Sequence, residues 1–92
     1  MVLGGWNFDD VKSCNLPQKV ASAFMAVMGE MTGADYMPVA YLGSQEVNGI
    51  NYCLIVLQTV ITPVSEKRPL KIIINVLPDG RASIVSTGGI NI

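Results

Sequence analysis

Apolar residues recur at helical spacing in one segment near the start of the chain. The positions that would share a helix face are Val20, Phe24, Val27, Met28 and Met31. Asn15 can cap the free amide groups of a helix, and Pro17 suits a first turn because that position needs no amide donor. Gly33 supplies a left-handed stop after the last apolar position. The pattern therefore predicts one helix, from Leu16 to Thr32.

From Tyr36 onward the pattern changes to runs rich in branched and aromatic residues, which are separated by turn residues. These runs predict three or four antiparallel strands, at Tyr36 to Gln45, Ile50 to Ile61, Leu70 to Leu77 and Arg81 to Thr87. Asn-Gly is a strong hairpin signal, and turns are expected at Val47-Asn48-Gly49 and at Pro78-Asp79-Gly80. Two prolines and three charged residues predict a loop from Thr62 to Pro69.

A single helix covers one face of such a sheet, so the sheet is expected to wrap the helix with its concave side. The alternation of the second strand assigns one set to that side: Ile50, Tyr52, Leu54, Val56 and Val60. The opposite set is also mostly apolar and includes Ile55, with Ile73 on the next strand. This convex face indicates self-association, such as a homodimer, or a protein partner. The alternative is a strand face that long side chains partly cover.

Composition and charge restrict the class of protein. The 92 residues suffice for one domain, and half are apolar, but no apolar run approaches the roughly 18 residues of a membrane span. The net charge of −1 comes from scattered residues and leaves no basic patch. Neither nucleic acid nor a membrane is therefore expected as a partner.

The chain has no histidine, which removes Ser-His and Cys-His nucleophile pairs and histidine metal ligands. We therefore expect no enzyme, no metal and no cofactor. Cys14 and Cys53 are too few for a zinc site, and they are expected to be reduced, packed as small hydrophobes. The alternative is a single disulfide. The first residues lack the features of a signal peptide, which predicts a cytoplasmic protein, or a secreted one whose leader has been removed.

The segment Gln45-Glu46-Val47-Asn48-Gly49 lies between the first two predicted strands and fits the pattern Gln-x-Val-x-Gly. This pattern is the first-hairpin signature of the cystatins, which inhibit papain-like cysteine proteases. Over nearly its whole length the chain resembles the stefins, the small branch of that family without disulfides or signal peptides. The resemblance also rests on Gly4-Gly5, on Gly49-Ile50-Asn51-Tyr52, on Leu77-Pro78 and on Thr87-Gly88.

The resemblance implies an α+β fold, the cystatin fold, in which a four- to five-stranded antiparallel sheet wraps one helix within a single domain, residues 1–92. It implies reversible, non-covalent inhibition, in which an apolar wedge occludes the protease cleft without engaging the catalytic cysteine. The implied contacts are Val2 and Leu3 in the non-primed subsites, Gly4 and Gly5 beside the protease wall, Gln45, Glu46, Val47, Asn48 and Gly49 at the centre, and Leu77 and Pro78 on the primed side.

Two features of the sequence depart from the family pattern. Glu46 is acidic where the family more often has an apolar residue, and Pro78-Asp79 replaces the Pro-Trp pair that secreted cystatins carry. The alternative function is a non-inhibitory protein-binding module on the same fold, because a fold does not fix a function. A strand-exchanged dimer is a related expectation, since branched Val47 in a tight turn stores strain that exchange would relieve.

Overall fold

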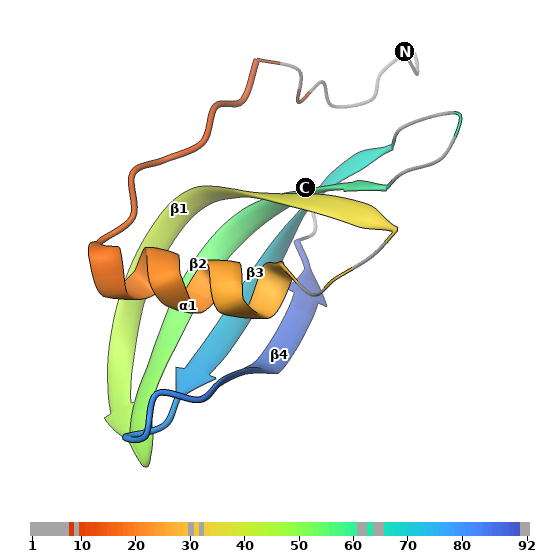
Figure 1. Ribbon diagram of the computed structural model, residues 1–92. Helices are drawn as coiled ribbons and strands as arrows, with labels where there is room; N and C mark the ends of the chain where they lie inside the picture. The colour runs from red at the N-terminus through yellow and green to blue at the C-terminus, as the bar shows by residue number, and fades with distance from the viewer. Residues whose placement is uncertain are drawn as a thin grey trace.

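The computed structural model describes residue 8, residues 10–29, residue 31, residues 33–60, residue 63 and residues 66–90. The elements follow in the order α1 (Gln18–Met28), β1 (Ala34–Val47), β2 (Gly49–Val60), β3 (Lys67–Val76) and β4 (Ala82–Gly89). The strands form one antiparallel sheet in the order β1-β2-β3-β4. In Figure 1 the curved sheet wraps around α1, which crosses its concave side. The described part of the chain thus has an α+β fold, as predicted.

The helix is shorter than the predicted segment at both ends. Pro17 is the N-cap residue and no side chain caps the first turn, so the predicted cap by Asn15 is wrong. The C-cap is Gly29, whose amide donates to the carbonyl oxygen of Met25 at 2.9 Å, and not Gly33. Glycine is the poorest helix former after proline, so α1 ends at the first glycine that the chain offers.

The four strands lie where they were predicted, but one boundary is in error. Lys67, Arg68 and Pro69 were predicted to belong to a loop, and they form the start of β3. Arg68 pairs with Gln58 of β2, whereas pairing with β4 begins only at Leu70. The start of β3 therefore behaves as an edge strand, where charged side chains and proline are tolerated.

The core lies between α1 and the concave face. Its members from the helix are Val20, Ala23, Phe24 and Met28, and those from the sheet are Tyr52, Leu54, Val56, Ile72 and Ile74. The predicted inward set of β2 is confirmed at its centre, where Leu54 and Val56 are fully buried. Two register shifts in β1, between Pro38 and Ala40 and between Tyr41 and Gly43, are bulges of the kind that bend a strand. Such bends help the sheet to curve around the helix.

The convex face exposes less apolar surface than its sequence indicates. Leu57 is buried there, and Ile55 and Ile73 are partly covered. Among the described residues, the large apolar side chains that are exposed are Met25, Met31, Leu42, Val47 and Val85. Neither convex isoleucine is among them, so the centre of this face is partly covered, whereas Leu42 beside Ile73 and Val47 at the end of β1 are exposed on the same side.

Candidate functional site

The first hairpin connects β1 to β2 through the predicted motif. Val47 pairs with Gly49, so Asn48 is the residue at the tip. Gly49 has a φ of 91°, a backbone conformation that side-chain-bearing residues rarely adopt. The side chains of the tip are exposed, and Val47 retains 51% of its accessible surface. The Asn-Gly signal therefore identified the turn correctly, and it presents an apolar side chain to solvent.

The second hairpin connects β3 to β4 and is closed by short-range hydrogen bonds. The amide of Leu77 donates to the carbonyl oxygen of Arg81 at 2.9 Å, and the amide of Gly80 donates to that of Leu77, also at 2.9 Å. Asp79 accepts hydrogen bonds from the backbone and the guanidinium group of Arg81, at 3.0 and 2.7 Å. The ion pair is exposed, so it adds little stability. Pro78 lies exposed at this tip.

The two tips lie against each other at one end of the sheet, as Figure 1 shows where both turns meet at the lower left. Gly49 is in close contact with the end of β3. A Cβ atom built on Gly49 would lie 2.1 Å from the carbonyl oxygen of Val76 and 2.9 Å from the Cα atom of Leu77. Glycine is therefore needed at this position both for its φ and for its lack of a side chain. The predicted residues Gln45 to Gly49, Leu77 and Pro78 are brought together.

A row of amide side chains supports the first tip from the convex face. Asn75 donates to the Oδ1 atom of Asn51 at 3.0 Å, and Asn51 donates to the Oε1 atom of Gln45 at 3.3 Å. Asn75 also donates to the backbone carbonyl oxygen of Asn48 at 3.4 Å. The row links β3, β2 and β1 and restrains the motif residue Gln45 and the backbone of the tip.

Sequence reasoning missed the contribution of Asn75. Its contact with Asn48 joins residues 27 positions apart, and it depends on the pairing of β2 with β3. The signal in the sequence was an asparagine within a strand otherwise rich in isoleucine, where asparagine is disfavoured. Such a residue is explained by a partner on the neighbouring strand.

The predicted contacts at the start of the chain are Val2, Leu3, Gly4 and Gly5, and they lie outside the described residues. Cys14 and Cys53 are both described and are not bonded to each other, as expected. Within the described ranges, no three histidine, cysteine, aspartate or glutamate residues gather as metal ligands would. No helix in the described part of the chain is long and apolar enough to cross a membrane.

The fold and the site thus define a small α+β protein that presents two adjacent hairpin tips at one end of an antiparallel sheet. No family model, no curated protein and no solved structure matches the chain. The function has to be argued from the residues and from their arrangement.

Proposed function

We propose that the chain is a reversible, non-covalent inhibitor of papain-like cysteine proteases, with a stefin-like cystatin fold, that acts by occluding the active-site cleft. The observation that carries the proposal is the contact between the two tips. The first tip contains the motif Gln45 to Gly49, and the second contains Leu77 and Pro78. Together they form one projecting edge, and neither tip needs a cofactor or a reactive side chain to fill a cleft.

Preorganisation supports this function. The second tip is closed by backbone hydrogen bonds, and the first is tied to β3 by Asn75 and by the close approach of Gly49. A rigid edge loses little conformational entropy on binding, so more of the contact energy appears as affinity. An interface of ordinary size, about 800 Å² on each partner, supports high affinity when its centre is well packed.

The chemistry of the tips also suits occlusion. Val47 is a half-exposed branched apolar residue, and Pro78 adds a rigid apolar surface without an amide donor. Neither tip carries a cysteine, serine or lysine that could act as a nucleophile, so contact through the tips would block a protease without a covalent bond. Because the contacting side chains are mostly uncharged, we expect the affinity to depend weakly on salt.

Titration of papain with the purified chain tests the proposal. We expect competitive inhibition, and the absence of inhibition at micromolar protein would contradict it. The matched variants are Val47→Asp and Val85→Asp, because both valines are similarly exposed, at 51% and 57%, and only Val47 lies at a tip. Val47→Asp is expected to weaken inhibition at least tenfold, about 1.4 kcal/mol, and Val85→Asp to leave it unchanged.

The start of the chain is tested separately. By the resemblance to stefins, Gly4 passes close to the protease wall, where a side chain has no room. Gly4→Arg is expected to weaken papain inhibition at least tenfold, about 1.4 kcal/mol. Unchanged inhibition would remove the residues before the helix from the mechanism and leave the two tips as the binding edge.

A further inference from the structure

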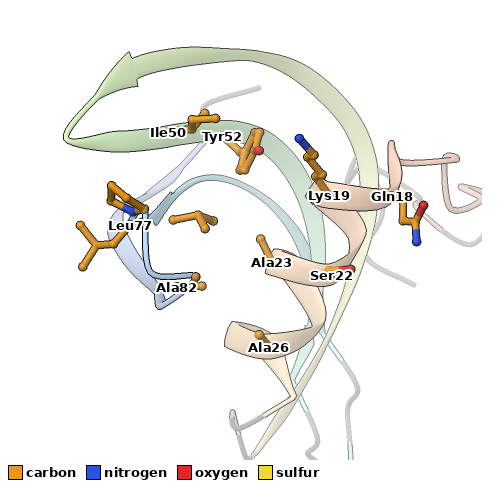
Figure 2. A pocket seen from close by; sticks show the side chains of 12 residues that line it. Gln18, Lys19, Ser22, Ala23, Ala26, Ile50, Tyr52, Leu77 and Ala82 are labelled. Atoms are coloured by element: carbon orange, nitrogen blue, oxygen red, sulfur yellow. The ribbon is translucent and has the colours of Figure 1, made fainter.

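A groove lies between α1 and the end of the sheet that carries the tips. It has a volume of about 790 Å³, which is within the range of small-molecule sites. Its walls come from two sides, with Ala23 and Ala26 of α1 facing Ile50, Val76 and Ala82 of the sheet. In Figure 2 these small helix side chains leave the space between helix and sheet open. The walls are therefore apolar over most of their area.

Lys19 and Tyr52 extend polar groups into this groove (Figure 2), which Gln18 and Ser22 of α1 also line. Lys19 is the one charged residue among those that line it, and it has no ion-pair partner in the described part of the chain. Figure 2 shows the side chains of Lys19 and Tyr52 both extending into the space between helix and sheet. Among the described residues, no acidic side chain lines the groove, and the first turn of α1 contains none. The groove is therefore electropositive on its helix side.

Tyr52 is the second polar group, and its hydroxyl is unused by the fold. The residue is only 7% exposed, and its ring packs against the ring of Tyr41 with the centroids 6.3 Å apart. Among the described residues, the Tyr52 hydroxyl has no hydrogen-bond partner. No side-chain nitrogen or oxygen in the same ranges is both fully buried and unpaired, so the unpaired hydroxyl keeps some accessible surface, and Tyr52 is among the residues that line the groove. A buried ring with a free hydroxyl is a ready hydrogen-bond donor to a ligand.

We propose that this groove binds a small amphipathic anion, an apolar chain or ring that carries one carboxylate. The apolar body lies between Ala26 and Val76, and the carboxylate accepts from the Lys19 ammonium group and the Tyr52 hydroxyl. A few convergent polar groups in an apolar pocket are the usual composition of a small-molecule site. The ligand is held mainly by α1 and the concave face, and because Leu77 and Pro78 also line the groove, a bound ligand would lie beside the second tip.

Titration with decanoate, decanol and decyltrimethylammonium tests the proposal, each kept below its micelle concentration and followed by amide chemical shifts. Decanoate is expected to bind most tightly and to shift the amides of Ala23, Ala26 and Tyr52. Shortening the chain to octanoate should weaken binding about fourfold for each methylene removed, since each buried methylene contributes about 0.8 kcal/mol. Equal binding of the cation, or shifts confined to the convex face, would overturn the proposal.

Two substitutions test separately how the charge of Lys19 and the space in the groove contribute to ligand binding. Lys19→Gln should weaken decanoate binding about three- to fivefold, as for a partly exposed ion pair, and leave decanol binding unchanged. Lys71→Gln is the matched control, because Lys71 is an exposed lysine of β3 that does not line the groove. Ala26→Leu places a larger side chain in the groove at an exposed helix position and should weaken both ligands. Equal effects of Lys19→Gln and Lys71→Gln, or full binding by Ala26→Leu, would overturn the assignment.

Discussion

The contact between the two tips makes a quantitative prediction at Gly49. Gly49→Ala introduces a methyl group at a φ of 91°, which costs about 1 kcal/mol for a residue other than glycine. The same methyl group would lie 2.1 Å from the carbonyl oxygen of Val76, so the end of β3 has to move. Overpacking of this kind costs a further 1–3 kcal/mol or so. We therefore expect Gly49→Ala to lower the free energy of unfolding by about 3 kcal/mol.

Gly80 provides a matched control for the strain alone. Its φ of 94° is nearly the same, but a Cβ atom built on it would meet nothing within 4 Å. Gly80→Ala should therefore cost only about 1 kcal/mol, which is the backbone term. The difference of about 2 kcal/mol between the two variants measures the contact between the tips, because the two backbone terms cancel.

Urea unfolding and thermal unfolding, both followed by circular dichroism, measure the free energy of unfolding and the Tm of both variants. In a domain of this size, 1 kcal/mol lowers the Tm by about 4–8 °C, so Gly49→Ala should melt roughly 10–25 °C below the unsubstituted chain. The slope with urea should stay the same in all three proteins, since the surface exposed on unfolding does not change. If Gly49→Ala is no less stable than Gly80→Ala, the first tip does not contact the end of β3, and the single binding edge is refuted.

Three further predictions concern the two faces of the sheet. Asn75→Ala removes two hydrogen bonds near the first tip, so it should lower the free energy of unfolding by about 1 kcal/mol and weaken papain inhibition. The control is Ser83→Ala, at the paired position of β4, which should change neither the stability nor the inhibition. Glu46→Leu should tighten papain inhibition about threefold, since an exposed carboxylate near the protease no longer has to lose water; weaker inhibition would show that it makes a favourable contact. Lysine at both Ile55 and Ile73 should abolish any dimer seen by light scattering and leave inhibition intact; a loss of inhibition would place the protease contact on the convex face.

Sequence periodicity predicted the elements that are defined by burial. The alternation along β2 places Leu54 and Val56 in the core because side-chain direction in a strand has a strict period of two. Boundaries were less predictable, since they depend on competing local signals. Two glycines were available to end α1, and the charges and proline before Leu70 looked like a loop until their pairing with β2 was known.

The candidate site, like the fold, could be predicted only in part from the sequence. The turn at Asn48 and Gly49 follows from local backbone preferences, so the sequence alone located it. The contact between Gly49 and Val76, and the bond from Asn75 to Asn48, follow from the register of β2 against β3. That register is set by burial along the whole strand, and no short motif encodes it.

The register also divides the first tip into two chemically different faces. Gln45 pairs with Asn51 and shares the convex face with the amide row, whereas Glu46 pairs with Ile50, which lines the groove on the concave face. Val47, the next residue in the strand, returns to the side of Gln45. Loss of water from a carboxylate is costly, so docking is favoured in the orientation that buries Gln45 and Val47 and keeps Glu46 at the rim of the contact, where its carboxylate loses only part of its water. Glu46, which is acidic where the cystatins more often have an apolar residue, would then select the orientation of the edge in the cleft, and we therefore expect Glu46→Leu to change the affinity only modestly.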